Sequence, residues 1–470
     1  MAEHGAGGGV GNAIKNYAFG FNPFVGLDVG NHDSFIHWIG EWGISRGLTL
    51  SVLFVGIFAM LFYEVPNLWL FTFGWLLGTA PIWLPVGLWM AAWKAWINYV
   101  RSHFLANRKP ILLEVKLPKE IYKSPLAMET VFSNLYVNSG ETGFVVRLLG
   151  SLFPYFSFEI ASFGGEIHFY AWCWGAYRSL VESSIYAQYP EVEIVEVEDY
   201  TQKFKFDPEI HTAFCGDYIY FGRGDEYPIK SYVDFELDKD PKEEYKVDPL
   251  AETFEVLSNL KPYEQVWIQM YFRWASYTGV LLRFSVTEDW KKRVFREVER
   301  IRKESALFAP DTHITEAEVR VARPRPTWRQ TEMMRAMERH LGKQPFEIGM
   351  RHAYISAGEF HGPTFTAVRW IYKALNSPVY FNFFRSRRAH NDFDYPWQDF
   401  RDFRWNLITR RYIDMMRRRS FFYTPWTTKT QIMSTEMMAT LYHYPSSVIK
   451  SPGIARIPSK KAEPPPNLPR

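Results

Sequence analysis

The sequence is poor in cysteine and lacks the common phosphate-binding and hydrolytic signatures. Cys173 and Cys215 are its only cysteines, and neither belongs to a pair with metal-ligand spacing. We expect both to be packing residues in a reducing compartment. The sequence contains no G-x-x-x-x-G-K-[ST] loop, no G-x-S-x-G elbow and no H-E-x-x-H pair. We therefore predict that the protein is not an enzyme and holds no cofactor or metal.

The positive and negative charges of the chain nearly balance, whereas its apolar runs are long. The net charge of +3 over 470 residues does not by itself indicate nucleic-acid binding. Leu48–Tyr63 and Val65–Trp93 carry no ionised side chain, and only Glu64 separates them. A helix needs about 20 apolar residues to cross a bilayer. The second run has this length, and the first reaches it if its helix begins near Trp42. We predict a transmembrane hairpin over residues 47–104, with a buried hairpin of a soluble protein as the alternative.

Basic residues flank this hairpin on both sides, and the turn between its helices has none. They are Lys15, Arg46, Lys94, Arg101, Arg108 and Lys109. By the positive-inside rule, we expect a multi-pass protein of the inner (plasma) membrane with both termini in the cytoplasm. Residues 1–46 form an N-terminal tail without the features of a cleaved signal peptide. In this tail, Asp33–Ile44 is predicted either as a helix in the membrane interface or as a loop packed on the hairpin.

Residues 105–200 alternate between strand and helix patterns and predict an α+β unit. In chain order we expect strands at Ile111–Lys116, Tyr155–Ser162, Glu166–Trp172 and 192–197, with helices opening at Ser124-Pro125 and spanning 176–188. Gly164-Gly165 joins the second and third strands as a hairpin turn. The order βαββαβ is that of the ferredoxin-like fold, an antiparallel sheet with two helices on one face.

Residues 201–386 predict a second ferredoxin-like unit that carries a helical insertion. Its expected strands are Ile229–Leu237, Gln265–Phe272, Phe346–Ser356 and Val379–Phe384. Its expected helices are Pro249–Leu260, Trp328–Leu341 and Thr364–Ala374, and the charged helix Trp290–Lys303 is expected to project as part of the insertion. The charges on this helix are typical of a solvated face.

Residues 387–445 are predicted as a helical region rich in arginine and aromatic residues, and a proline-rich tail follows over 446–470. The arginines expected to contact a partner or a phosphate are Arg385, Arg387, Arg388, Arg410, Arg411, Arg417, Arg418 and Arg419. Three interpretations stay open, namely docking to another subunit, contact with anionic lipid headgroups and binding of nucleic acid. His390, Asp392 and Asp394 in this region are interpreted as a solvated turn rather than as metal ligands.

Several phrases, taken in order, resemble the N-terminal, non-motor half of membrane-anchored type IV secretion coupling ATPases. These belong to the HerA/FtsK-like conjugation family of bacteria and archaea. The phrases are Leu117-Pro118-Lys119-Glu120-Ile121, Phe156–Phe169, Ala187–Glu193, Asp248–Ala251, Gln265–Gln269, Ser434–Glu436 and Tyr442–Pro445. The resemblance spans roughly residues 109–470.

In that family a membrane segment and a ferredoxin-like region precede a RecA-like motor. The present sequence reaches Arg470 about where the motor would begin, so the motor is expected on a separate polypeptide. The resemblance implies a non-catalytic inner-membrane subunit of a type IV secretion or conjugative DNA-transfer system. Such a subunit would belong to an oligomeric complex in the lipid bilayer and anchor or position a separate ATPase. The alternatives are a membrane-tethered protein that binds DNA directly and an envelope scaffold without a motor partner.

Overall fold

The protein is described from a computed structural model. It describes residues 46–64, 67–118, 123–137, 152–221, 223–238, 248–275, 286–307, 326–377, 382–389, 399–423, 425–445, 453–454 and 456–457. The chain forms two compact units, one of residues 1–95 with 390–408 and one of residues 96–389 with 409–470. The helix or loop predicted at 33–44 lies outside the described residues, as do His390, Asp392 and Asp394.

Two apolar helices, α3 (Arg46–Glu64) and α4 (Leu68–Ala106), follow each other along the chain. Large apolar side chains along both helices are exposed. By length and composition, Leu70–Ala106 of α4 could cross a membrane, and its apolar stretch is not buried by protein. The apolar helical segment Ser51–Met60 of α3 is shorter than a span. Among the described residues one candidate span is therefore identified, and the second span of the hairpin stays a prediction.

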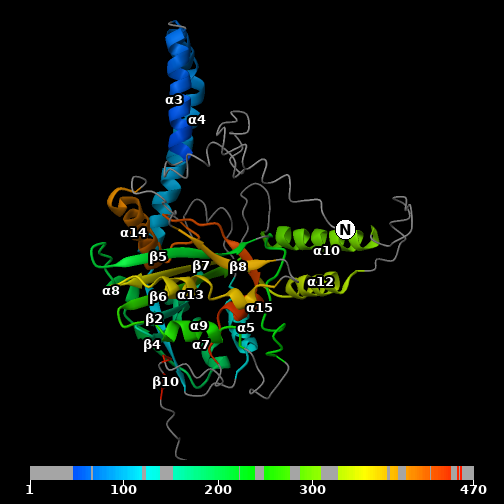
Figure 1. Cartoon of the computed structure of the whole chain (residues 1–470). Coiled ribbons are helices and arrows are strands. Elements are labelled where there is room, and N and C mark those ends of the chain that lie inside the picture. The colour runs from blue at the N-terminus through cyan, green and yellow to red at the C-terminus, as the bar shows by residue number, and fades with distance from the viewer. Residues whose placement is uncertain are drawn as a thin grey trace, which may run out of the picture. The chain divides into compact units, whose positions relative to one another are not determined.

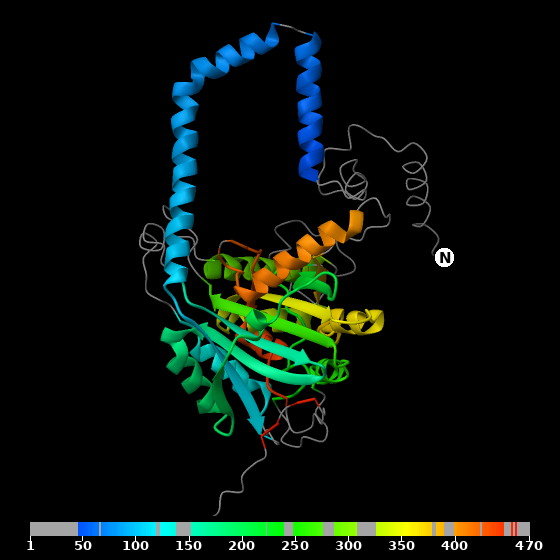
Figure 2. The ribbon, with the colours of Figure 1, turned by 90° about the vertical axis from the view of Figure 1, so that its left-hand side faces the viewer.

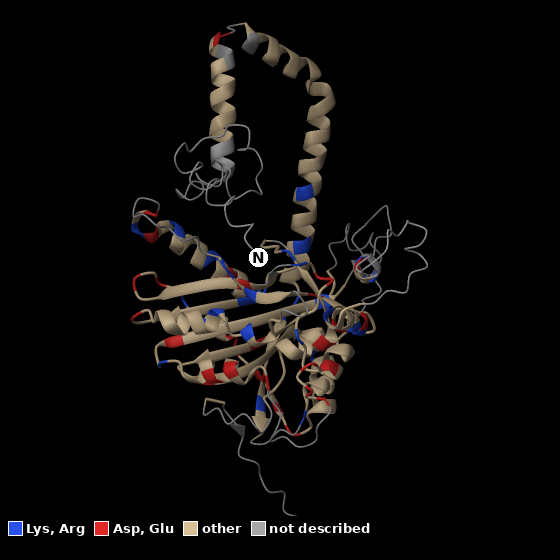
Figure 3. Ribbon diagram, turned by 45° about the vertical axis from the view of Figure 1, so that its right-hand side comes forward, with Lys and Arg blue, Asp and Glu red and all other residues tan. Residues whose placement is uncertain are grey.

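Helix α4 is uncharged over most of its length and basic at its C-terminal end. Figure 3 shows this change, which begins at Lys94 and continues with Arg101. Pro81 and Pro85 lie inside the helix, and Figure 2 shows that the helix is bent. Proline removes an intrahelical hydrogen bond and clashes with the preceding turn, so a bend is expected where two prolines occur.

The α+β part is built on one ten-stranded sheet (Figure 1). Along its main path the strands are ordered β10-β1-β3-β2-β6-β7-β5-β8, while β4 pairs with β1 and β9 pairs with β7. The pairs are antiparallel, except that β10 runs parallel to β1. The strands are β1 (Pro110–Pro118), β2 (Tyr155–Phe163), β3 (Glu166–Trp174), β4 (Glu193–Val197), β5 (Thr212–Phe221), β6 (Glu264–Trp274), β7 (Pro345–Ser356), β8 (Phe383–Arg388), β9 (Gln431–Ser434) and β10 (Arg456–Ile457).

The sheet has two halves with the same strand order. The first half is ordered β4-β1-β3-β2, and the second is ordered β8-β5-β7-β6. The halves meet where β2 pairs with β6 over the full length of β2, from Tyr155 opposite Arg273 to Phe163 opposite Gln265. The two regions predicted as successive α+β units therefore share one continuous sheet.

Helices cover one face of this sheet, and their apolar residues form the larger core with alternate strand residues such as Phe156 and Phe158. These helices are α5 (Pro125–Asn134), α7 (Arg178–Gln188), α9 (Ala251–Ser258), α13 (Gly362–Arg369) and α15 (Thr435–Leu441). The opposite face packs against Met416 of α14 (Phe403–Arg417), against Phe421 and Phe422 after it, and against the end of α4. Shorter elements are α8 (Tyr200–Lys203), η1 (Gly175–Tyr177), η3 (Lys373–Leu375) and η4 (Phe400–Asp402).

The hairpin predicted at Gly164-Gly165 is confirmed between β2 and β3. Both glycines have positive φ, +58° and +95°, the backbone conformation that a two-residue turn of type I′ requires. A Cβ atom on Gly165 would lie 2.6 Å from the Ser258 carbonyl oxygen. This turn therefore needs glycine both for its conformation and for the close approach of the C-terminal end of α9.

The strand predicted at Ile229–Leu237 is wrong, because this segment forms consecutive turns. The Asp234 carboxylate accepts hydrogen bonds from the Ser231 backbone N–H at 2.9 Å and from the Ser231 hydroxyl at 3.1 Å. Such local bonds compete with a strand ladder. Ile229 and Leu237 are still buried in the larger core. Their alternating pattern therefore reflects burial of these side chains, although the segment is not a strand. The first strand of this half is β5, at 212–221, which lies before the predicted position.

The charged helix predicted at Trp290–Lys303 is α10 (Val286–Leu307), and the helix predicted at Trp328–Leu341 is α12 (Trp328–Leu341). The two helices pack through a small apolar core that contains Trp290, Val294 and Met337. Among the described residues of the tail predicted over 446–470, β10 pairs with β1 and Ile454 bridges to Ile167. The strand predicted at Val379–Phe384 overlaps β8 (Phe383–Arg388) only at residues 383–384, and its residues 379–381 lie outside the described residues.

Candidate functional site: an arginine-lined cleft above a buried ion pair

A row of polar side chains crosses the sheet on the face opposite the helices. Its members lie opposite one another on seven neighbouring strands: Glu114, Tyr170, Glu159, Gln269, Arg351, Asp217 and Arg387. The four central members of this polar row, Glu159, Gln269, Arg351 and Asp217, are at most 2% exposed. Buried charges are tolerated only when they are paired and hydrogen-bonded, so the polar row must be satisfied by what covers it.

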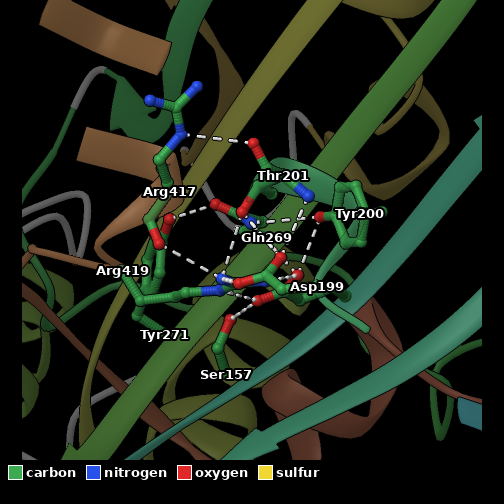
Figure 4. Close-up of polar contacts among 9 residues, drawn as sticks. Ser157, Asp199, Tyr200, Thr201, Gln269, Tyr271, Arg417 and Arg419 are labelled. Carbon is green, nitrogen blue, oxygen red and sulfur yellow. Dashed lines mark hydrogen bonds and ion pairs between the residues drawn. The ribbon is translucent and has the colours of Figure 1, made fainter. Parts of the chain in front are cut away.

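Arg419 supplies the main counter-charge, and Figure 4 shows it beside Asp199. It is 1% exposed and Glu159 is fully buried. Its Nε donates to Glu159 Oε1 at 3.0 Å, and its Nη2 donates to Glu159 Oε2 at 3.1 Å. Its Nη1 and Nη2 also donate to the Asp199 carboxylate. One guanidinium thus bridges β2 to the segment that opens α8, in the bidentate geometry that suits arginine.

The remaining lone pairs of Glu159 are satisfied by neutral donors. The hydroxyls of Ser157 and Tyr200 donate to it at 2.8 and 2.7 Å, and the Gln269 amide donates at 3.0 Å (Figure 4). Asp199 in turn accepts from the Thr201 backbone N–H at 2.9 Å and from the Thr201 hydroxyl at 2.6 Å. This ion-pair cluster therefore leaves neither carboxylate unpaired.

Arg419 reaches this position because α14 ends in a Schellman motif. The Ser420 N–H donates to the Met415 carbonyl at 3.0 Å, and the Arg419 N–H donates to the Met416 carbonyl at 3.2 Å. The left-handed residue of such a motif is usually glycine, but here it is Arg419, with φ +46°. A side chain in this conformation costs about 1–2 kcal/mol. The ion pairs to Glu159 and Asp199 offset that cost.

At this cluster, burial and the neighbouring charges shift the pKa values in opposite directions, and the neighbouring charges have the larger effect. Burial raises the pKa of Asp199, but the Arg419 guanidinium and hydrogen bonds from Thr201 bring that pKa below its usual range. Burial lowers the pKa of Arg419, but Glu159 and Asp199 raise it further than burial lowers it. Asp199 and Arg419 are therefore charged at neutral pH, and their ion pair holds the end of α14 to the segment that opens α8.

A cleft of about 620 Å³ lies beside this cluster. Ser102, Leu105, Ala106 and Arg108 line it from the end of α4 and the link to β1. The sheet contributes Pro110, Tyr155, Trp172 and Trp174, and the α8 segment contributes Asp199 and Gln202. The other wall is formed by Asp414, Arg417, Arg418, Arg419, Ser420, Phe421, Tyr423 and Pro425. Aromatic rings and guanidinium groups thus face a common space, which is the arrangement expected for an anionic ligand with an apolar part.

Two of the four arginines that line the cleft are paired with carboxylates, and two are not. Arg418 pairs with Asp414 at 2.8 Å, and Arg419 pairs as described above. Arg417 donates only to carbonyls, those of Thr201 at 3.2 Å and Phe204 at 2.9 Å. The Arg108 guanidinium carbon lies over two rings, 4.7 Å from the centroid of Phe104 and 5.6 Å from that of Trp174. Within the described residues, neither Arg108 nor Arg417 has a carboxylate within salt-bridge distance, so the cleft has an excess of positive charge.

The eight arginines predicted as one contact surface lie in three different settings. Arg385, Arg387 and Arg388 belong to β8, and Arg387 extends the polar row with its Nη2 3.3 Å from Asp217. Arg410 and Arg411 are exposed on α14. Arg417 and Arg418 line the cleft, whereas Arg419 is buried in the ion-pair cluster. Which of these arginines contact a partner or a phosphate stays a prediction.

Residues that sequence reasoning did not single out complete the site. Arg108 was identified only as a flanking charge of the hairpin and Trp172 only as the end of a predicted strand, whereas Trp174 was not identified. Glu159 and Asp199 were not identified, because each is a single acidic residue in an ordinary local pattern. Glu159 alternates onto the strand face opposite Phe156, Phe158 and Ile160, where a polar residue is expected, so no local signal indicated its burial.

Both cysteines are free and buried, as predicted for packing residues. Burial raises the thiol pKa of each to about 12, so neither is a reactive thiolate. In the part of the chain that the structure describes, no group of three or more histidine, cysteine, aspartate or glutamate side chains is arranged to hold a metal ion.

Comparison with models of known protein families and with curated proteins finds no match to this chain. The resemblance to coupling ATPases therefore stays a prediction.

Proposed function

We propose that this chain is a non-catalytic inner-membrane subunit of a type IV secretion or conjugative DNA-transfer system. It anchors or positions a separate HerA/FtsK-like ATPase. In this proposal α3 and α4 form a transmembrane hairpin with both termini in the cytoplasm. The α+β part is a pair of ferredoxin-like units that face the cytoplasm and provide the surface for the partner.

The observation that carries the proposal is the exposed apolar length of α4, which is continuous with the folded part of the chain. An apolar helix without a protein cover has to be covered by lipid or by another subunit. At its other end α4 is packed, because the Phe104 ring lies 5.9 Å from the Trp174 ring and Leu105 contacts the core of the second sheet face. A membrane helix held in this way is suited to fixing a cytoplasmic platform at the membrane.

The strand orders support the ferredoxin-like assignment. In each half of the sheet, the first and third strands are central, the fourth lies beside the first, and the second lies beside the third. This is the order that the βαββαβ plan requires. Fusion through β2 and β6 accounts for a single sheet built from two such units.

Exposed side chains along α14 support a partner-contact role. Phe403 and Leu407 are 69% and 57% exposed, and they are spaced to share one side of a helix. Arg410 and Arg411 follow them and are exposed as well. Large apolar residues beside arginine are typical of the residues that contribute most to protein interfaces.

The test is an affinity pull-down of the full-length protein from membranes in mild detergent, with mass spectrometry of the co-purified proteins. We expect a phosphate-loop ATPase to co-purify, and Arg410→Glu/Arg411→Glu to reduce its recovery at least tenfold. The matched control is Arg302→Glu/Arg335→Glu, which reverses two exposed charges on α10 and α12 and should leave recovery unchanged. Recovery of no ATPase from wild-type protein would contradict the proposal.

The alternative function, a membrane-tethered protein that binds DNA directly, predicts binding that falls steeply with salt. Reversal of Arg417, Arg418 and Arg419 is a poor test of it, because Arg419 is buried and the change would disrupt the ion-pair cluster. Arg410→Glu/Arg411→Glu is the better variant. DNA retention that falls with this variant, without a co-purified ATPase, would favour the tether.

A further inference from the structure

We propose that the arginine-lined cleft binds the phosphate group of an anionic phospholipid, with Arg108 and Arg417 as the residues that contact it. The inference rests on the proposed membrane anchoring by α4. It adds a binding site and a ligand class that the anchoring alone does not require.

The excess positive charge of the cleft favours an anionic ligand. Arg108 and Arg417 are its two arginines that lack a carboxylate partner among the described residues. A guanidinium has five N–H donors, and Arg417 uses one at Nε and one at Nη2 for backbone carbonyls. Donors therefore remain on both side chains, in the forked geometry that binds phosphate oxygens in pairs.

The apolar and aromatic walls of the cleft favour a ligand that also has an apolar part. Leu105 and Ala106 lie on one side, and Tyr155, Trp172 and Trp174 lie on the sheet side. A volume of about 620 Å³ exceeds what an inorganic phosphate needs, and it lies within the range of sites for larger ligands. A glycerophospholipid headgroup with the start of its acyl chains has both the charge and the apolar surface.

The position of the cleft along α4 favours a lipid over a soluble phosphate compound. Trp96 and Tyr99 are exposed near the end of the apolar stretch, and such aromatic residues are enriched at the headgroup level. At 1.5 Å per residue, the cleft begins at Ser102, about 5 Å further along the helix axis than Tyr99. The headgroup layer is itself about 5–8 Å thick. The cleft is therefore within reach of a lipid headgroup while the acyl chains lie along α4.

The test uses full-length protein purified in mild detergent, with bound lipid counted by native mass spectrometry after addition of phosphatidylglycerol or phosphatidylcholine. We expect preferential retention of phosphatidylglycerol by wild-type protein. Arg108→Ala/Arg417→Ala should reduce that retention at least about tenfold, the effect of one charged hydrogen bond. Arg302→Ala/Arg335→Ala removes two exposed arginines of α10 and α12 and should retain the lipid as wild type does. Arg108→Lys/Arg417→Lys keeps the charge and should lose less than the alanine variant.

Equal retention of both lipids by wild-type protein, or unchanged retention by the alanine variant, would overturn the inference. A second arm adds inorganic phosphate and follows the thermal denaturation of the protein. Stabilisation by phosphate that depends on Arg108 and Arg417, without lipid retention, would identify a soluble phosphate ligand and exclude the lipid. Loss of lipid preference with intact membrane insertion and ATPase recovery would leave the proposed function standing. Far-ultraviolet circular dichroism verifies that each variant is folded.

Discussion

Removal of the Arg419 guanidinium should be among the most destabilising single changes in the sheet part of the protein. In Arg419→Ala, the fully buried Glu159 loses both of its charged hydrogen bonds, and Asp199 loses its ion pair. Removing one partner of a buried ion pair typically costs 3–5 kcal/mol, because the other charge stays buried. The three neutral donors to Glu159, from Ser157, Tyr200 and Gln269, stay in place. We therefore expect a cost near 3 kcal/mol.

The left-handed conformation of Arg419 gives an internal comparison. Alanine at φ +46° keeps the backbone strain, whereas glycine relieves it. Arg419→Gly should therefore be more stable than Arg419→Ala by about 1 kcal/mol, although both lack the guanidinium. Arg419→Ala/Glu159→Gln should also recover part of the loss, because the fully buried position 159 then carries no uncompensated charge.

Thermal denaturation of the full-length protein in detergent, followed by intrinsic fluorescence, measures these differences. A loss of about 3 kcal/mol corresponds to a decrease in Tm of several degrees, up to about 10 °C for a fold of this size. Arg418→Ala is the matched control, because it removes the neighbouring arginine, which is 60% exposed and makes only a surface ion pair. The reasoning would be refuted by a Tm of Arg419→Ala within 2 °C of wild type, or by no recovery when Glu159→Gln is added.

Three further predictions concern packing and pH. A Cβ atom on Gly349 would lie 1.9 Å from a ring carbon of Phe421, so Gly349→Ala should lower stability by about 1–3 kcal/mol; an unchanged Tm would contradict this packing. Burial lowers the pKa of His352 to about 3. This folded-state pKa is below the unfolded value, so the stability it contributes is present above pH 6.5 and is lost as the pH falls towards 3, by about 1.4 kcal/mol per pH unit. Tm measured between pH 7 and 5 should fall less steeply in His352→Gln than in wild type. Burial by itself lowers the pKa of His443, but the Asp248 carboxylate raises it above its usual value; the resulting stabilisation is present below pH 6.5 and is lost as the pH rises through the folded-state pKa. His443→Gln should therefore remove the part of the Tm decrease above pH 6.5 that this pair causes, and equal slopes in both proteins would argue against the pair.

Local patterns in the sequence predicted the elements whose signals are local. The turn at Gly164-Gly165 and the helix at 328–341 are two such cases, because a glycine pair and a capped amphipathic run each specify their own geometry. Strand β5 was missed because Gly216 and Asp217 interrupt its apolar alternation. Contacts with neighbouring strands explain why glycine and aspartate occupy these two positions. A Cβ on Gly216 would lie 2.6 Å from the Arg387 carbonyl, and Asp217 belongs to the polar row.

The joining of the two halves could not be predicted from the same signals. The pairing of β2 with β6 brings Glu159 opposite Gln269, 110 residues later in the chain. Arg419 completes this site from 260 residues away. Periodicity identifies which side of a strand is buried, but it carries no information about which distant strand or side chain will cover it. The cleft depends on these long-range contacts, so its lining was outside the reach of sequence reasoning.

Three consecutive arginines at the end of α14 show why composition alone could not assign their roles. Arg417 still has helical geometry and points its donors to the carbonyls of the α8 segment, beside the cleft. Arg418 lies on the exposed side and pairs with Asp414, one turn earlier. The left-handed turn then directs Arg419 inward to Glu159. Because the same turn of the chain fixes the positions of all three arginine side chains, a change at Arg419 should also displace Arg417. Lipid retention is therefore informative only with variants that leave the ion-pair cluster intact, which is the reason to test Arg417 together with Arg108.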